Sequence, residues 1–153
     1  MSTISIREMM PGDVPAIAWI ERFSFTAPWS ETSFYSEVYS RYSITRVAEL
    51  DGLIAGYVCV KQIVDECHLL DIATHPDYRK QGIATMLLND VLGDLKEGSC
   101  RNMYLEVRAS NFAAKKLYEK FGFKTAGIRR RYYSQPEEDA VIMALRLGSD
   151  EPA

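Results

Sequence analysis

A short basic stretch between two apolar segments has the residue types that bind phosphate. Residues 79–82 (Arg-Lys-Gln-Gly) follow the strand-like run 69–74 and precede a helical pattern that begins at Ile83. The unpaired N–H groups and the dipole at a helix start favour an anion, and a glycine lets an oxygen approach the backbone. The pattern predicts a phosphate-binding loop, although neither common glycine-rich phosphate motif is present. The alternative is an ordinary strand-to-helix turn with a solvated basic face.

Two titratable side chains farther along the chain could transfer protons. Glu106 lies in the middle of a predicted strand, on the same face as Arg108, and Tyr118 lies beside the apolar stripe of the next predicted helix. A carboxylate can accept a proton and a phenol can donate one. The alternatives are a solvated carboxylate or a partner of Arg108 for Glu106, and a buried aromatic for Tyr118. From spacing alone, these alternatives are the better interpretations.

The composition argues against two classes of partner. The chain has 153 residues, of which 47% are hydrophobic and 25% charged, as in an ordinary globular domain with its own core. The net charge of −3 argues against nucleic-acid binding. No apolar run approaches the roughly 20 residues that cross a bilayer. The sequence therefore predicts neither a nucleic-acid nor a membrane partner.

The histidines and cysteines do not have the spacing of a metal site. His68 and His75 have no clear third ligand, and Cys59, Cys67 and Cys100 show no zinc-binding pattern. The odd number of cysteines and the lack of a signal peptide fit a reducing cytoplasm. We therefore expect no metal, a cytoplasmic location, and three unpaired cysteines that serve as small core residues.

Hydrophobic periodicity and turn residues divide the chain into alternating elements. Strands are expected at 3–8, 43–50, 53–62, 67–74, 101–108, 123–133 and 138–147, and helices are expected to begin near Asp13, Ser30, Ile83 and Asn111. In the first helix, a stripe of Ala16, Ile17, Ile20 and Phe23 is expected to face the core. This order fits a single α/β domain over 1–147, with one mixed sheet and helices on both faces. Residues 148–153 are expected to form a disordered tail.

Four stretches, in the same order along the chain, resemble one family of enzymes. Residues 105–111 read Leu-Glu-Val-Arg-Ala-Ser-Asn, and 114–118 read Ala-Lys-Lys-Leu-Tyr before Gly122-Phe123. The others are Pro28-Trp29-Ser30, Arg79-x-x-Gly82-x-Ala84, and Arg129-Arg130-x-Tyr132-Tyr133. Together they resemble the ribosomal-protein-alanine N-acetyltransferases, the RimI family within the GNAT superfamily. The resemblance covers about residues 3 to 147, and it implies the GNAT fold with a mostly antiparallel sheet of six to seven strands.

The resemblance also implies roles for particular residues. Glu106 would be the general base, acting directly or through one water, and Tyr118 would protonate the departing CoA thiolate. The backbone N–H of Ile72 would face the thioester oxygen. The residues implied in binding acetyl-CoA are Leu70, Ile72, Ala73, Thr74, Arg79, Lys80, Gln81, Gly82, Ile83, Ala84, Thr85, Asn111 and Tyr118. Those implied in binding the acceptor are Trp29, Glu106, Arg108, Tyr132 and Tyr133.

The acceptor that the resemblance implies is a protein N-terminus, the alanine of a small-subunit ribosomal protein. Acetylation of lysine or of a small amine on the same scaffold is an alternative, and a non-catalytic acyl-CoA-binding module is another. The sequence departs from the family pattern at Arg131, where an extra cation would oppose a cationic substrate unless Glu137, Glu138 or Asp139 offsets it. We expect a monomer or a weak homodimer.

Overall fold

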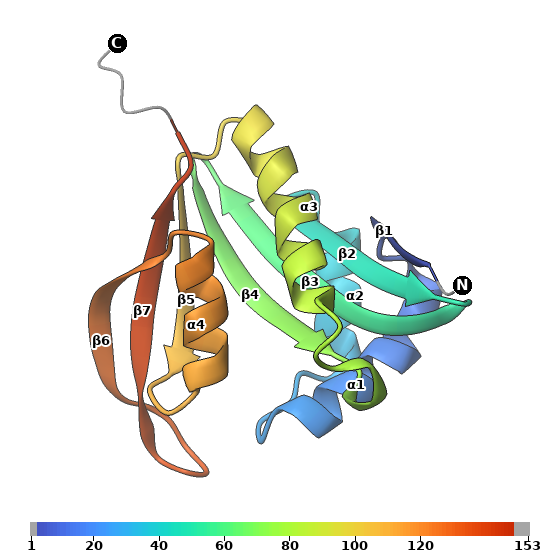
Figure 1. Cartoon of the computed structure of the whole chain (residues 1–153), viewed down its shortest axis with the longest axis horizontal. Coiled ribbons are helices and arrows are strands. Elements are labelled where there is room, and N and C mark those ends of the chain that lie inside the picture. Colours follow the sequence, from blue (N-terminus) through green and yellow to red (C-terminus); the bar gives the residue numbers. More distant parts are fainter. Residues whose placement is uncertain (1–2, 149–153) are drawn as a thin grey trace. The chain divides into compact units, whose positions relative to one another are not determined.

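The computed structural model describes residues 3–148 and contains every predicted helix and strand. The strands are β1 (Ile4–Glu8), β2 (Ser43–Leu50), β3 (Leu53–Ile63), β4 (Glu66–Thr74), β5 (Asn102–Arg108), β6 (Lys124–Tyr133) and β7 (Glu138–Arg146). The helices are α1 (Val14–Ser24), α2 (Glu31–Tyr39), α3 (Ile83–Glu97) and α4 (Phe112–Lys120), with short 3-10 helices η1 (Pro11–Asp13) and η2 (Pro76–Tyr78) (Figure 1). Of the predicted tail, 149–153 lie outside the described residues.

The strands hydrogen bond in the order β1-β2-β3-β4-β5-β7-β6 and form one seven-stranded sheet. The pairs β1–β2, β2–β3, β5–β7 and β6–β7 are antiparallel, whereas β4 and β5 are parallel. This confirms the predicted mixed, mostly antiparallel sheet. The chain divides into two compact units, one with the residues up to Lys61 and Leu70–Asp94, the other with Gln62–Leu69 and the residues from Leu95 on.

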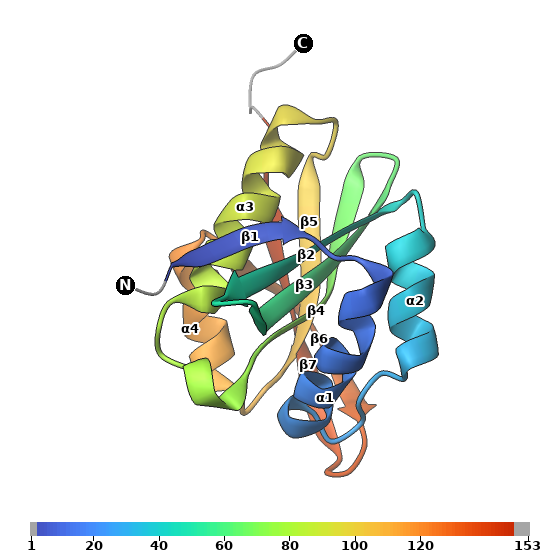
Figure 2. The same ribbon diagram turned by 90° about the vertical axis from the view of Figure 1, so that its right-hand side faces the viewer.

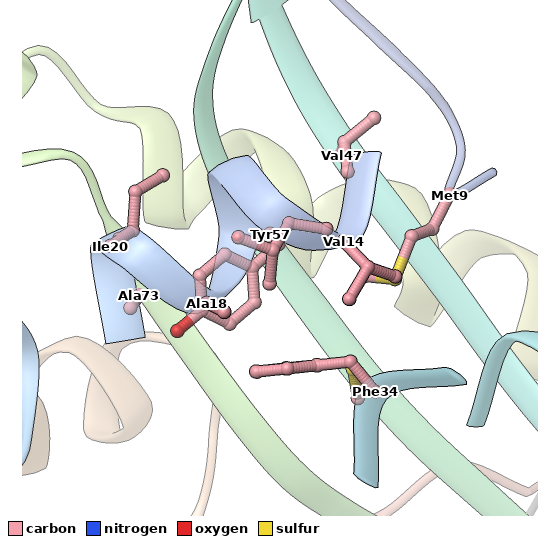
Figure 3. Packing of buried hydrophobic residues seen from close by; sticks show 10 residues of the cluster. Met9, Val14, Ala18, Ile20, Phe34, Val47, Tyr57 and Ala73 are labelled. Atoms are coloured by element: carbon pink, nitrogen blue, oxygen red, sulfur yellow. The ribbon is translucent and has the colours of Figure 1, made fainter. Parts of the chain in front are cut away.

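In the first unit, helices cover both faces of the strands (Figures 1 and 2). Side chains alternate along β3. On one face, Tyr57 packs in a buried cluster with Ile17 of α1 and Phe34 of α2 (Figure 3). On the other face, a Cβ at Gly56 would lie 2.8 Å from Cγ2 of Ile83 in α3, so only glycine fits under that helix. These contacts confirm the predicted helices on both faces.

The stripe predicted for α1 is partly wrong. Ile17 and Ile20 are buried as expected, but Ala16 and Phe23 are exposed, Phe23 by 60%. The face that packs on the sheet instead includes Val14, which is fully buried. The helix is therefore rotated relative to the predicted stripe, and its core face follows Val14, Ile17 and the residues one turn later.

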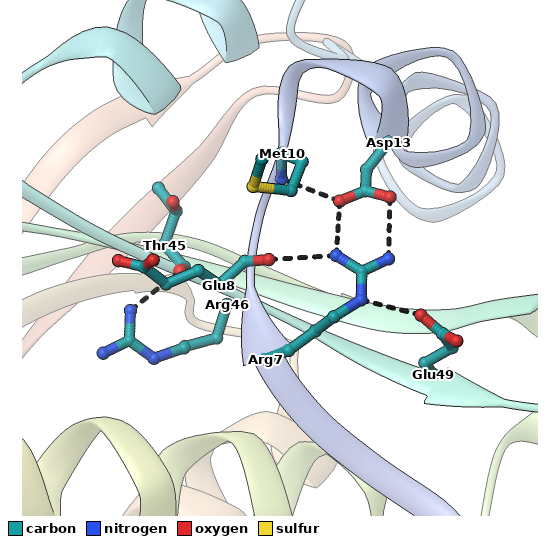
Figure 4. Close-up of polar contacts among 7 residues, drawn as sticks. All are labelled: Arg7, Glu8, Met10, Asp13, Thr45, Arg46 and Glu49. Carbon is teal, nitrogen blue, oxygen red and sulfur yellow. Dashed lines mark hydrogen bonds and ion pairs between the residues drawn. The ribbon is translucent and has the colours of Figure 1, made fainter.

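A branched ion pair fixes β1 to the start of α1 and to β2 (Figure 4). The Arg7 guanidinium donates to both carboxylate oxygens of Asp13 at 2.9 Å and, through Nε, to Glu49 at 2.7 Å. Asp13 also accepts the backbone N–H of Met10 at 2.7 Å. These hydrogen bonds hold the pKa of the Asp13 carboxyl below its usual range, against the opposing effect of burial. Asp13 stands at the predicted N-cap position, but its side chain does not cap α1.

The turn and the other caps follow the local sequence as predicted. Asp51 and Gly52 have φ values of 51° and 82°, the left-handed conformation required by a two-residue hairpin turn. The side chain of Ser30 accepts the backbone N–H of Ser33 and so caps α2. Asn111 accepts the N–H of Ala114 at 3.1 Å and caps α4.

The prediction of three unpaired cysteines is wrong for two of them. All three are buried, but Cys67 and Cys100 form a disulfide with an S–S distance of 2.07 Å. Cys67 lies in β4, and Cys100 lies two residues before the start of β5 in the same unit. Parallel pairing of Cys67 with Met103 brings the two segments together, which sequence spacing could not reveal. Cys59 is the free, buried cysteine that was predicted.

Candidate active site

The predicted site residues are divided between the two units. The phosphate loop, the second half of β4 and Trp29 belong to the first unit, while Glu106, Tyr118 and the two tyrosines of β6 belong to the second. Within residues 3–148, no group of three or more histidine, cysteine or acidic side chains could hold a metal ion, and no helix is long and apolar enough to cross a bilayer.

The predicted phosphate loop connects η2 to α3 through two residues with positive φ. Lys80 has φ 65° and Gly82 has φ 77°, and no atom lies within 4 Å of the position that a Cβ on Gly82 would take. The first hydrogen bond of α3 runs from the N–H of Met86 to the carbonyl of Gly82 at 3.0 Å. The N–H groups of residues 83–85 therefore have no partner inside the helix. An open glycine, free helical N–H groups and exposed Arg79 and Lys80 together fit a diphosphate.

The adjoining part of β4 alternates between the core and more accessible positions. Asp71 and Ala73 are buried, whereas Leu70 is 38% exposed and Ile72 and Thr74 are intermediate. Ala73 packs in the cluster with α1, so only its backbone is available to a ligand. The N–H of Ile72, predicted to face the thioester oxygen, lies beside the Asp71 carboxyl, and this contact lowers the pKa of that carboxyl by less than burial raises it.

A buried polar cluster that the sequence reading missed lies next to this strand. Glu21 of α1 is 1% exposed, accepts the hydroxyl of Tyr57, and accepts the backbone N–H of Trp29 at 3.0 Å. Asp71 faces Glu21, and its Oδ2 is buried without a hydrogen-bond partner. Burial, followed by the contact with Glu21, raises the pKa of Asp71 to about 10. The signal was present, because Glu21 falls at helical spacing from Val14 and Ile17, and Asp71 interrupts an apolar alternation.

We expect Asp71→Asn to raise the free energy of unfolding by about 1–3 kcal/mol near neutral pH. The folded protein keeps a proton on Asp71 that the unfolded chain releases above the ordinary aspartate range. The free energy of unfolding therefore falls as pH rises from that range towards about 10. The asparagine side chain does not titrate, so the variant does not lose stability in this way. Urea unfolding at pH 5 and pH 8 measures it, and the gain should be larger at pH 8. Asp65→Asn, the same change at an exposed position, should show no gain. An equal gain at both pH values would contradict the prediction.

In the second unit, Glu106 and Tyr118 lie on opposite faces of the strands. Met143 and Val141 of β7 line a pocket together with residues of α4, so α4 covers this face of the strands. Leu105 of β5 is paired with Met143 and therefore points to the same face. Glu106 points to the other face because side chains alternate along β5. Tyr118 is 6% exposed, and its ring packs against Phe123 with centroids 5.8 Å apart.

Glu106 has a cation and a hydroxyl beside it. The Nε of Arg129 lies 3.9 Å from Oε1 of Glu106, and the hydroxyl of Tyr132 faces the same carboxylate. The interaction with Glu106 is the main reason why the pKa of Tyr132 is raised. Burial, and then the charge of Glu106, raise the pKa of Tyr133 to about 12.

A register shift in β6 brings both predicted tyrosines to this face. Pairing with β7 shifts a first time between Thr125 and Gly127 and a second time between Arg129 and Tyr133, and Arg131, within the second shift, has a φ of 53°. In an uninterrupted strand, two consecutive residues point to opposite faces. Here Tyr132 reaches Glu106. The Arg108 guanidinium lies over the ring of Tyr133, with its Cζ 4.4 Å from the ring centroid.

Arg108, predicted to bind the acceptor, holds the turn between β6 and β7. Its guanidinium donates to the carbonyls of Ser134 at 3.3 Å and Pro136 at 3.0 Å, and it lies 3.3 Å from Glu138. The extra cation Arg131 is offset as the sequence reading required, because its Nε lies 3.2 Å from Glu137. Arg108 therefore supports the loop that carries the tyrosines, and a direct role in acceptor binding stays a prediction.

Comparisons with known proteins show the family to which the chain belongs. A model of the acetyltransferase (GNAT) family matches residues 14–123. The chain is 41% identical over 149 residues to the ribosomal protein bS18-alanine N-acetyltransferase of Escherichia coli K12, covering 96% of this chain and 99% of that protein. Identity to the Salmonella typhimurium enzyme of the same name is 40% with the same coverage. The crystal structure of the ribosomal-protein-S18-alanine N-acetyltransferase from Escherichia coli is similar, with a TM-score of 0.89 and 37% identity, covering 99% of this chain and 97% of that one.

Proposed function

Since this chain belongs to the acetyltransferase (GNAT) family, we propose that it transfers acetyl from acetyl-CoA to a protein N-terminus, the α-amine of an alanine in a small-subunit ribosomal protein. The observation that carries the proposal is the similarity, over nearly the whole of both chains, to enzymes named for that reaction. The groups proposed for the two proton transfers are the accessible carboxylate of Glu106 on β5 and the phenol of Tyr118 on α4, which lie on opposite faces of the second unit.

The proposed reaction is a direct attack of the amine on the thioester. The nitrogen lone pair forms a bond to the acetyl carbon, and the carbon–sulfur bond breaks. Glu106 takes one proton from the amine, directly or through a water, and Tyr118 gives one to the leaving thiolate. A peptide α-amine has a pKa of about 7.7–8.0, so a carboxylate is a sufficient base near neutral pH.

The first unit would bind the donor. The N–H groups at the start of α3 and the cations of residues 79–80 would hold the diphosphate. The backbone of residues 70–74 would pair with the pantetheine amides as an added strand. Asn111 belongs to the second unit, where it caps α4, and its contact with the cofactor arm stays a prediction.

The second unit would hold the acceptor through the face that carries Glu106. Tyr132 and Tyr133 would close over the N-terminal residue. Trp29 of the first unit, whose backbone N–H is held by Glu21, stays a predicted acceptor contact. We infer a cytoplasmic location, and a monomer or weak homodimer that binds neither nucleic acid nor membrane.

We expect Gly82→Val to weaken acetyl-CoA binding by at least tenfold, about 1.4 kcal/mol. A β-branched side chain disfavours the φ of 77° and fills the space in front of the helical N–H groups. Isothermal titration with acetyl-CoA measures the affinity.

Gly52→Val is the matched control for this experiment. Gly52 has a similar φ of 82° and is equally open, but it lies in the β2–β3 turn. Both variants should lose similar stability, and only Gly82→Val should lose affinity. Equal acetyl-CoA affinities for the two variants would contradict the phosphate-loop assignment.

The decisive test of function uses acetyl-CoA and short peptides. A peptide with a free N-terminal alanine should be acetylated, the same peptide with a blocked N-terminus should not, and mass spectrometry locates the modification. Modification of lysine side chains alone would favour the alternative enzyme. Binding of acetyl-CoA without any transfer would favour the non-catalytic module. Mass spectra of ribosomal protein N-termini with and without this protein would identify the acceptor.

A further inference from the structure

The carboxylate assigned as the base already faces a positive charge. Arg129 of β6 and Glu106 of β5 are separated by β7, and the Nε–Oε1 distance is 3.9 Å. The Arg129 guanidinium also lies over the ring of Tyr132, 5.5 Å from its centroid. The arginine side chain is 56% exposed, and the contacts that orient it are with this aromatic ring and with the carboxylate.

The acceptor creates an electrostatic problem for this site. Below pH 8, an α-amine is mostly an ammonium ion, which cannot attack a thioester. An uncompensated carboxylate would attract that ammonium and stabilise it in the unreactive form. A cation placed beside the carboxylate removes most of this attraction and favours the neutral amine.

We propose that Arg129 acts through Glu106 to select the neutral form of the acceptor, because its guanidinium occupies the position beside the carboxylate that an ammonium would take. The inference rests on the proposed function. It makes Arg129 a positioning residue that balances the charge of the base without entering the reaction.

The other groups on this face do not supply the same compensation. Arg108 is paired with Glu138, and the hydroxyls of the tyrosines are neutral at working pH. His68 of β4 lies beside Tyr104 and 3.9 Å from Glu66. The charged or titratable groups that flank Glu106 on the surrounding strands include His68, Tyr104, Arg108, Tyr132, Tyr133 and Glu138.

The test compares Arg129→Gln with the wild-type protein on an alanine peptide between pH 6 and pH 9. At pH 6.5 the variant should have a lower KM for the peptide and a kcat reduced about three- to tenfold, because the ammonium form binds better but does not react. Its kcat should return to the wild-type value by pH 9. In the plot of kcat against pH, the rise on the acidic side should therefore move to higher pH by about one unit. Arg129→Lys should restore the wild-type profile.

Arg131→Gln is the matched control, since it removes the same charge from the same strand at a residue paired with Glu137. It should keep the wild-type profile. An unmoved profile for Arg129→Gln, or a KM that rises equally at every pH, overturns the inference, since the second result would mean that Arg129 contacts the peptide. Wild-type protein that fails to acetylate the peptide removes the proposed function, and this inference with it. An active wild type with an unmoved variant removes the inference alone.

Discussion

Glu106→Gln should lower turnover of an alanine peptide by about 10²- to 10⁴-fold, the range typical of a lost general base. Glutamine keeps the size and polarity of the side chain but cannot accept the amine proton. The loss should be greatest at low pH, where little of the amine is already neutral. Steady-state rates at saturating acetyl-CoA between pH 6 and pH 9 measure it.

Glu66→Gln is a suitable control, because Glu66 is also a strand carboxylate facing a basic side chain, with His68 at 3.9 Å. It should leave the rate unchanged. If Glu106→Gln had wild-type turnover across the pH range, Glu106 would have no part in the mechanism, and the residue would be only the partner of Arg129.

Tyr118→Phe should lower turnover by about 10²-fold or more while leaving acetyl-CoA affinity nearly unchanged. The substitution removes the hydroxyl that would protonate the thiolate. It keeps the ring that packs against Phe123, so the fold of this unit should be preserved. Turnover measured beside isothermal titration with acetyl-CoA separates loss of chemistry from loss of binding.

Tyr39→Phe removes a hydroxyl from an exposed tyrosine of α2 and serves as the control. It should have wild-type turnover. A Tyr118→Phe variant with normal turnover would show that another group, or water, protonates the thiolate. If the variant lost acetyl-CoA affinity and turnover together, Tyr118 would bind the cofactor and would not be the proton donor.

The local sequence was enough to predict the elements and the chemistry that each could carry. Asp51 and Gly52 form the predicted turn because their positive φ values are a local preference. Ser30 and Asn111 cap their helices through hydrogen bonds that span only three residues. Strand alternation likewise predicted that Glu106 and Arg108 share a face. The roles assigned to Glu106 and Tyr118 came from the resemblance to a family and stay predictions until the variants are measured.

Contacts between residues distant in the sequence were decided only by the tertiary structure. Parallel pairing of β4 with β5 brings Cys67 to Cys100, and a register shift in β6 turns Tyr132 as well as Tyr133 towards one face. Packing of α1 on β4 buries Glu21 against Asp71. Sequence periodicity gives the face on which a side chain lies, but not the strand register or helix rotation that sets its partners across the fold. For the same reason, the sequence identified a possible base, and only the folded chain placed Arg129 beside it.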